Sequence, residues 1–140
     1  DHAQLVKNIE EQRSSLEKYI KTAAKEICPN ITSIIDSLLT CKLLAFCGSL
    51  ERLSKLSAST IQLLGAEKAL FRHMRNQGKS PKFGVIFADH RIQTAQDDKR
   101  GKIARLIAAK LMVAARIDFY SSRYDEKLAK QLEEEIKAIK

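Results

Sequence analysis

The first 27 residues carry an apolar stripe typical of a long amphipathic helix. Its positions recur at spacings of four or three residues, with Glu and Lys between them: Leu5, Ile9, Gln12, Leu16, Tyr19, Ala23 and Ile27. This spacing indicates a coiled-coil-type helix, about 40 Å long at 1.5 Å per residue. A single helix of this kind needs a partner helix for stability. Because no cap precedes the stripe, we expect Asp1 to be a cut point and the partner helix to lie upstream.

The next part of the chain also shows helical spacing. Cys28-Pro29-Asn30 interrupts the first helix, because proline disfavours helix in the residue before it. A second helix is predicted at about 31–47, with Gly48 as its stop. Residues 49–56 can form a short helix that begins with a serine cap. Residues 57–64 are short and apolar, and they fit either a helical or an extended conformation.

The second half of the chain alternates between helical and irregular segments. A helix is predicted at about 66–76, and residues 77–101 are the longest irregular stretch, of a length that is usually functional or disordered. Within that stretch, residues 83–87 are apolar enough to form a buried extended piece. Strong helices are predicted at about 101–120 and 123–140. The pattern therefore predicts an all-α helical bundle with a long N-terminal coiled-coil-type helix.

Composition excludes several classes of protein. The chain has 140 residues, enough for one domain with one core, and no apolar run approaches the ~18–20 residues of a membrane span. We also expect no signal peptide. The three cysteines, Cys28, Cys41 and Cys47, lie in apolar stretches and form no CxxC pair, which favours buried thiols in a reduced compartment over a metal or redox site.

The net positive charge is confined to one segment. Residues 65–116 contain twelve lysines and arginines against four acids, which accounts for the whole formal net charge of +8. Charge concentrated in this way indicates a polyanionic partner that binds at one place. On a helical wheel of residues 101–117, Lys102, Arg105 and Arg116 fall within about 60° of one another and opposite the apolar face, while Lys110 lies at the boundary. These cations match a phosphate-binding ridge.

A second basic cluster follows the helix that Gly65 opens. It consists of Arg72, Arg75, Lys79 and Lys82, the last two in the irregular stretch. Gly65 and Ala66 offer backbone N–H groups to a phosphate at the helix start, although Glu67 competes for the same dipole.

The sequence contains no phosphate loop, dinucleotide-binding, zinc-protease or nucleophile-elbow motif. His2, His73 and His90 are too scattered for a ligand set, and the adjacent acids Asp97-Asp98 have no base or metal motif nearby. We therefore expect no catalytic residue, no metal and no cofactor, and a nucleotide-dependent enzyme is disfavoured.

Two long motifs carry a family resemblance. The first reads Ser59-Thr60-Ile61-Gln62-Leu63-Leu64-Gly65-Ala66-Glu67-Lys68-Ala69-Leu70-Phe71-Arg72. The second reads Arg100-Gly101-Lys102-Ile103-Ala104-Arg105, followed by Ala108-Ala109-Lys110 and Ala114-Ala115-Arg116-Ile117-Asp118. Together they resemble the Nop domain over about residues 20–120, in the branch of Nop five, fifty-six and fifty-eight. The short, simple chain suggests the archaeal form, which implies a cytoplasmic location.

The resemblance implies a scaffold of the box C/D small ribonucleoprotein, which directs guide-dependent RNA 2′-O-methylation. Nop domains recognise a composite surface formed by a kink-turn RNA and the small kink-turn-binding protein already on it. A pre-mRNA splicing factor shares the domain and uses it in the same way. Full-length relatives add an N-terminal domain that holds the fibrillarin methyltransferase, and a coiled coil that self-associates. We expect the former to be missing here and the latter to be at most half present.

The family's RNA contacts map onto Lys55, Lys82, Arg100, Lys102 and Arg105, and the start of the first motif also lies near RNA. With the basic cluster, the candidate RNA-binding set is Lys55, Gly65, Ala66, Lys68, Arg72, Lys79, Lys82, Arg100, Lys102 and Arg105. This chain departs from the family before the second motif, where Thr94–Lys99 replaces a segment with proline and tryptophan. Two acids in that segment weaken phosphate binding unless they face away.

We predict three parts: residues 1–27 as part of a coiled-coil helix, 28–120 as the Nop RNA- and protein-binding domain, and 121–140 as a C-terminal helix packed on it. Two alternatives to box C/D RNA binding stay open. One is a protein-interaction or oligomerisation module that acts through the coiled-coil helix, with the basic face incidental. The other is a splicing-related ribonucleoprotein binder.

Overall fold

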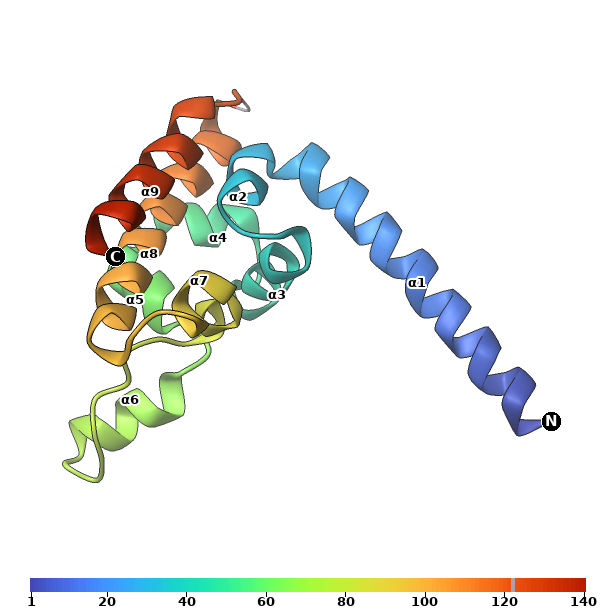
Figure 1. The fold of residues 1–140 in the computed structure, drawn as a ribbon, viewed down its shortest axis with the longest axis horizontal. Helices are drawn as coiled ribbons and strands as arrows, with labels where there is room; N and C mark the ends of the chain where they lie inside the picture. Colours follow the sequence, from blue (N-terminus) through green and yellow to red (C-terminus); the bar gives the residue numbers. More distant parts are fainter. Residues whose placement is uncertain (122) are drawn as a thin grey trace.

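The computed structural model describes residues 1–121 and 123–140, which contain helices and no strand. The elements are α1 His2–Ile27, α2 Pro29–Ile34, α3 Ser37–Cys47, α4 Leu50–Lys55, α5 Ala58–Leu63, α6 Glu67–Met74, η1 Val85–Ala88 (a 3₁₀ helix), α7 His90–Gln93, α8 Asp97–Tyr120 and α9 Glu126–Ile139 (Figure 1). The predicted all-α class and the long N-terminal helix are confirmed.

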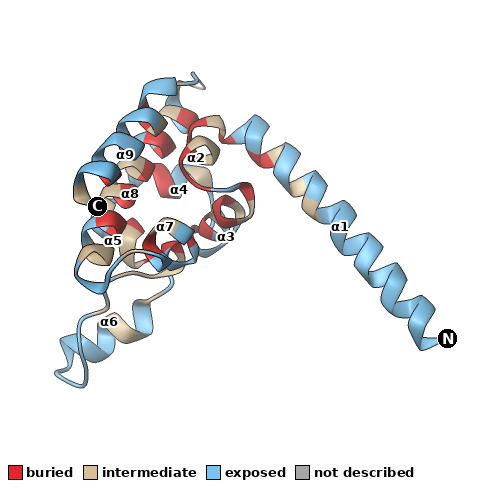
Figure 2. Ribbon diagram, viewed as in Figure 1, coloured by how far each residue is buried: buried red, intermediate tan, exposed pale blue. Residues whose placement is uncertain are grey.

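Helix α8 is the centre of the bundle. Helices α2, α4, α5, α7 and α9 all pack on it, and buried residues concentrate where they meet (Figure 2). Ile103, Ile107 and Leu111 of α8 are fully buried, whereas Lys102 and Arg105 are exposed. The helical wheel therefore assigned the two faces of this helix correctly.

Helix α1 extends away from the bundle as a rod (Figure 1). Its last turns contact α3 and α2, and Ala24 is its one residue that is described as buried. The apolar stripe is exposed over most of its length, with Leu16 62% and Tyr19 71% exposed.

A buried carboxylate joins the start of α2 to the end of α8. Asp118, near the end of α8, accepts hydrogen bonds from the backbone nitrogens of Asn30 and Ile31, both at 3.0 Å. It also accepts one from Asn30 Nδ2 at 2.8 Å. These donors lie at the start of α2, where backbone N–H groups have no helical partner. Asp118 therefore caps α2 from another helix.

The side chain of Asn30 extends this network to the α8–α9 connection. Its Nδ2 donates to the carbonyl of Arg123 at 2.7 Å, and its Oδ1 accepts from the backbone nitrogen of Asp125 at 2.7 Å. Asn30 is fully buried. Pro29, at which the sequence predicts the end of the first helix, is the first residue of α2.

The three cysteines are free thiols. Cys28 and Cys47 are buried as expected, and Cys41 is partly exposed. Burial raises the pKa of the Cys28 thiol to about 11, with smaller contributions from Asp118 and Cys41. This thiol is therefore a neutral packing group at physiological pH.

The single helix predicted at 31–47 is wrong. It is divided into α2 and α3 by Ile35, whose backbone is extended at φ −125° and ψ 161°. The next residue, Asp36, caps α3 by accepting from the backbone nitrogen of Leu39 at 2.8 Å. Apolar spacing continues across the break because both helices bury side chains in the same core. Residues 57–64, left open by the sequence, are mostly helical as α5.

The predicted irregular stretch at 77–101 is too long. It contains η1 and α7, and α8 begins already at Asp97. The expected extended piece at 83–87 is instead largely the 3₁₀ helix, with Ile86 buried. Helices of four residues complete about one turn, so they leave no periodic signal.

Asp118→Asn should destabilise the fold by about 3 kcal/mol, because an amide nitrogen would face buried donors. Asp36→Asn is the matched control: Asp36 is exposed, and asparagine caps a helix as well as aspartate. Its effect should stay within about 0.5 kcal/mol. Urea denaturation followed by circular dichroism measures both. Equal stabilities for the two variants would contradict the capping role of Asp118.

Candidate nucleic-acid interface

The outer face of α8 presents a row of cations. Lys102 and Arg105 are exposed, and neither forms an ion pair in the part of the chain that the structure describes. Arg116 is exposed on the same face and donates from Nε to the carbonyl of Ser54 at 3.4 Å. We call Lys102, Arg105 and Arg116 the α8 ridge. A ridge without carboxylates suits phosphate binding.

Lys110, predicted at the boundary of this face, points to α9. Its Nζ lies 3.0 Å from Glu135 Oε1 and 3.2 Å from Gln131 Oε1, and its side chain is 17% exposed. Lys110 therefore joins α8 to α9 and does not belong to the ridge.

Arg100 also has partners within the chain. Its Nε and Nη2 donate to the carbonyls of Ala95 and Gln93, each at 3.0 Å, and its Nη1 lies 2.6 Å from Asp97 Oδ1. The guanidinium thus joins the end of α7 to the first turn of α8. Asp97, one of the two acids in the divergent segment Thr94–Lys99, therefore pairs with Arg100.

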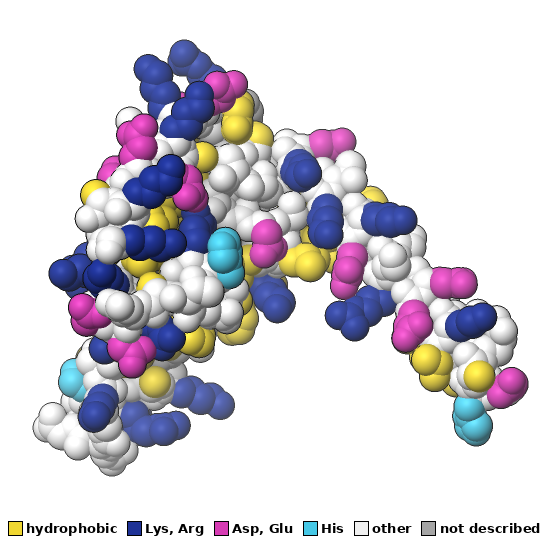
Figure 3. Space-filling model, in the orientation of Figure 1, with side chains coloured by type: hydrophobic (Ala, Val, Ile, Leu, Met, Phe, Trp, Pro, Cys, Tyr) yellow, Lys and Arg dark blue, Asp and Glu magenta, His cyan; other side chains and the backbone are white. Residues whose placement is uncertain are grey.

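Helix α6 and the loop after it project from the bundle (Figure 1). Every residue from 71 to 80 is exposed, and cationic side chains gather around α6 in Figure 3, whereas α1 and α9 show both signs. Lys68, Arg72 and Lys79 of the candidate set lie here. No residue of α6 is buried, so these side chains lie on a surface that stands out from the core.

The backbone N–H groups expected at the start of α6 are already bonded. Gly65 N donates to Glu67 Oε1 at 3.0 Å, and Ala66 N donates to the carbonyl of Leu63 at 2.8 Å. The Glu67 carboxylate therefore accepts the hydrogen bond of Gly65 N that the sequence predicts for a phosphate. Gly65 and Ala66 shape the turn into α6, for which Gly65 adopts φ +94°.

Lys82 is held beside α5 by a set of backbone contacts. Gln62 Nε2 donates to the carbonyl of Lys82 at 2.6 Å, and Gly84 N donates to the carbonyl of Gln62 at 2.8 Å. A Cβ on Gly84 would lie 2.1 Å from Leu64 O. Because α5 packs on α8, these contacts anchor the basic loop next to the helix that carries the ridge.

Lys55, the last residue of α4, is exposed and lies 3.0 Å from Glu51 Oε1 through its Nζ. The preceding residue, Ser54, accepts the hydrogen bond from Arg116. Lys55 is therefore next to the C-terminal part of the α8 ridge.

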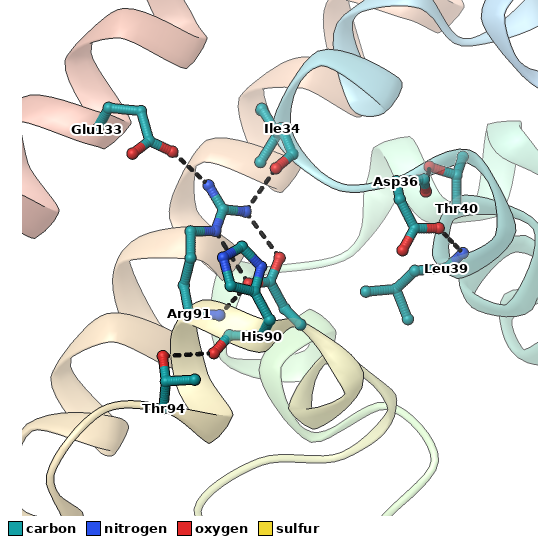
Figure 4. Close-up of polar contacts among 9 residues, drawn as sticks. Ile34, Asp36, Leu39, Thr40, His90, Arg91, Thr94 and Glu133 are labelled. Atoms are coloured by element: carbon teal, nitrogen blue, oxygen red, sulfur yellow. Dashed lines mark hydrogen bonds and ion pairs between the residues drawn. The ribbon is translucent and has the colours of Figure 1, made fainter.

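The sequence did not reveal the role of Arg91, which belongs to the basic segment but is nearly buried. Its side chain is 12% exposed and pairs with Asp89 at 2.7 Å and Glu133 at 2.8 Å, and it also donates to the carbonyl of Ile34 (Figure 4). Burial acts to lower the pKa of Arg91, but Asp89 and Glu133 outweigh it and the pKa is raised. Arg91 thus joins α7 to α2 and α9.

The cations of residues 65–116 therefore fall into two groups. Arg91, Arg100 and Lys110 hold helices together, and Lys99 Nζ donates to the carbonyl of Lys140 at 3.1 Å. The ridge, α6 and its loop present exposed cations. Among the described residues, no three His, Cys, Asp or Glu side chains form a group that could hold a metal. No helix there is both long and apolar enough to cross a bilayer.

Comparison with known proteins matches this chain to Nop proteins. The family model described as "Nop: snoRNA binding domain, fibrillarin" matches residues 1–139. Human nucleolar protein 56 is 39% identical over 135 residues, which cover 94% of this chain and 23% of that protein. A NOP5 family protein of Methanocaldococcus jannaschii is 39% identical over 138 residues, which cover 99% of this chain and 33% of that protein.

A solved structure, titled as a fibrillarin/Nop5p complex, has the same fold. The match has a TM-score of 0.81 and 33% identity, and it covers 99% of this chain and 52% of that one. The chain thus spans a third or less of the length of these two relatives. The chain is 39% identical to both the human and the archaeal protein. These identities favour neither source, so the archaeal origin stays a prediction.

Gly84→Ala should lower the free energy of unfolding by about 1–3 kcal/mol, because the methyl group displaces the Leu64 carbonyl. Gly101→Ala is the matched control, since a Cβ there meets nothing within 4 Å. Within α8 it should stabilise the fold by about 0.5–1 kcal/mol. Urea titrations compare both variants with the parent. An unchanged Gly84→Ala variant would contradict the close packing of the basic loop on α5.

Proposed function

The chain belongs to the Nop family, and on this premise we propose that it is an RNA-binding scaffold module without catalytic activity of its own. The observation that carries the proposal is the α8 ridge. Lys102 and Arg105 belong to the second family motif, and they are exposed, without carboxylate partners in the described residues. Each phosphate that such a cation neutralises releases bound counterions, which drives binding.

The rigidity of α8 supports this function. Six elements pack on α8: α2, α4, α5, α7, α9 and η1. The backbone beneath the ridge cations is therefore already ordered, so binding has to order only their side chains. Lys82 adds a second anchored cation beside α5. Lys68 and Arg72 extend the surface on the projecting α6, and Lys79 extends it on the loop that follows. Arg100 contributes by holding the start of α8 in place, and Lys55 extends the surface at the other end of the helix.

We further propose that the RNA is a box C/D guide RNA with a kink-turn, bound together with its kink-turn-binding protein. The family model is described as a snoRNA-binding domain, and the chain follows the family's two motifs. The exposed cations are spread over α6, its loop and α8, a distribution that suits recognition of a folded RNA by shape.

Fibrillarin is a proposed partner of the full-length protein. The matched solved structure is titled as a complex with fibrillarin, and the methyltransferase would be held by a domain outside residues 1–140. We retain two further proposals: the three-part division at residues 27 and 120, and a cytoplasmic location in an archaeon. The human relative is named as nucleolar.

Lys102→Ala and Arg105→Ala should each reduce the slope of log affinity against log salt concentration by about 0.7–0.9, one phosphate contact apiece. Filter binding over a salt series measures the slope on a kink-turn RNA, alone and preassembled with its small binding protein. Binding is expected only to the preassembled pair. Lys7→Ala on the distant α1 is the control and should leave the slope unchanged. An unchanged slope for Arg105→Ala would remove this residue from the interface.

A second function, self-association through α1, is favoured by one observation. The apolar stripe is exposed, with Leu5 57% and Ile9 56% exposed. Such a face is buried when helices pair by coiled-coil packing. Under this alternative, the basic surface is incidental.

Deletion of residues 1–16 separates the two functions. All of these residues are exposed, and Glu17 is the first residue of α1 that is partly buried. We expect RNA binding to survive the deletion within about twofold and to be lost on charge reversal at Lys102 and Arg105. Sedimentation velocity and the filter assay measure mass and binding in the same samples. Loss of binding on deletion, with harmless charge reversal, would favour the protein-interaction alternative.

A further inference from the structure

The face of α8 that carries the ridge ends in exposed aromatic side chains. Tyr120 is 69% exposed and Phe119 is 39% exposed. Their rings are 4.9 Å apart with an interplanar angle of 77°, an edge-to-face pair. The contact with Phe119 restrains the Tyr120 ring while leaving most of it open to solvent. Neither ring belongs to the hydrophobic core.

Cations frame this aromatic pair. Arg116 precedes Tyr120 by four residues, so the two lie on the same face of α8. The bond from Arg116 to Ser54 O brings the end of α4, with Lys55, beside them. Glu51 raises the pKa of the Lys55 ammonium group, mainly through the hydrogen bond between them.

Glu51 is the one acid that pairs with these cations in the described residues, and its bond to Lys55 is weak. The pair is exposed, with 61% of the Lys55 side chain and 56% of the Glu51 side chain accessible. Exposed ion pairs spaced by four residues on a helix add little to stability, because water screens the two charges. A phosphate can therefore replace the carboxylate at small cost.

We propose that Tyr120, held by Phe119, stacks against an unpaired base of the bound RNA, with the flanking phosphates on Arg116 and Lys55. The proposal rests on the RNA-binding function above and adds an aromatic contact, Tyr120, that neither family motif includes. Stacking on an aromatic ring tolerates any base, because every base has a π face. The neighbouring cations favour a nucleic acid over an apolar protein surface as the occupant.

The length of α8 makes one continuous RNA path feasible. Lys102 and Tyr120 are about 27 Å apart along the helix at 1.5 Å per residue. An RNA bound at Lys102 and Arg105 therefore needs several unpaired nucleotides to reach Tyr120. RNA that ends at its paired region would not reach it.

The test uses the whole chain and two kink-turn RNAs, each preassembled with the kink-turn-binding protein. One ends in a blunt duplex, and the other carries a single-stranded extension of about eight nucleotides with 2-aminopurine in it. Tyr120→Ala should weaken binding of the extended RNA by about fivefold or more, with little effect on the blunt one. It should also abolish the quenching of 2-aminopurine fluorescence. Tyr120→Trp should retain both signals.

Tyr19→Ala is the matched control, because Tyr19 on α1 is 71% exposed. It should change neither measurement, and thermal melts should show both alanine variants folded. Equal affinity of Tyr120→Ala and the parent for the extended RNA, with Arg105→Ala still impaired, would overturn the stacking site alone. Equal weakening on both RNAs would also overturn it and favour a protein contact at Tyr120. Failure of the parent chain to bind either assembly would overturn the RNA-binding function and the stacking site together.

Discussion

Asp118 places a carboxylate in the core near the end of α8, where it accepts three hydrogen bonds from Asn30 and Ile31, and the arrangement of the bundle follows from this contact. The side chain of Asn30 also binds the backbone of Arg123 and Asp125 in the α8–α9 connection. One network thus fixes the start of α2, the end of α8 and the approach to α9. Because a buried carboxylate without partners is costly, the three elements are held in one geometry.

The fixed position of α8 also fixes the orientation of its outer face. Its buried residues and its ridge residues are on one helix, so packing of the core determines where the cations point. Other cations of the same segment, such as Arg91, are part of that packing and are not available to a partner. Net charge alone therefore overestimates the size of the binding surface, whereas burial identifies the cations that remain free.

The sequence predicted features that repeat over many residues or depend on one local rule. The two faces of α8, the long helix α1, the break at Pro29 and the stop at Gly48 are of this kind. It could not predict the break at Ile35, because the apolar spacing continues through it. Nor could it predict the bonds of Arg91, Arg100 and Gly84, which depend on residues brought together by folding.

The rod α1 joins the bundle through its last turns. Each residue added to an α-helix both lengthens it and rotates one end relative to the other. The 26 residues of α1 span about 39 Å, and each residue turns the helix by about 100°. One residue inserted into the exposed part would move the bundle only about 1.5 Å, yet it would swing the ridge by more than a quarter of a circle relative to the first turn. The number of residues in α1 therefore sets the direction in which the basic surface faces, more sharply than it sets its distance.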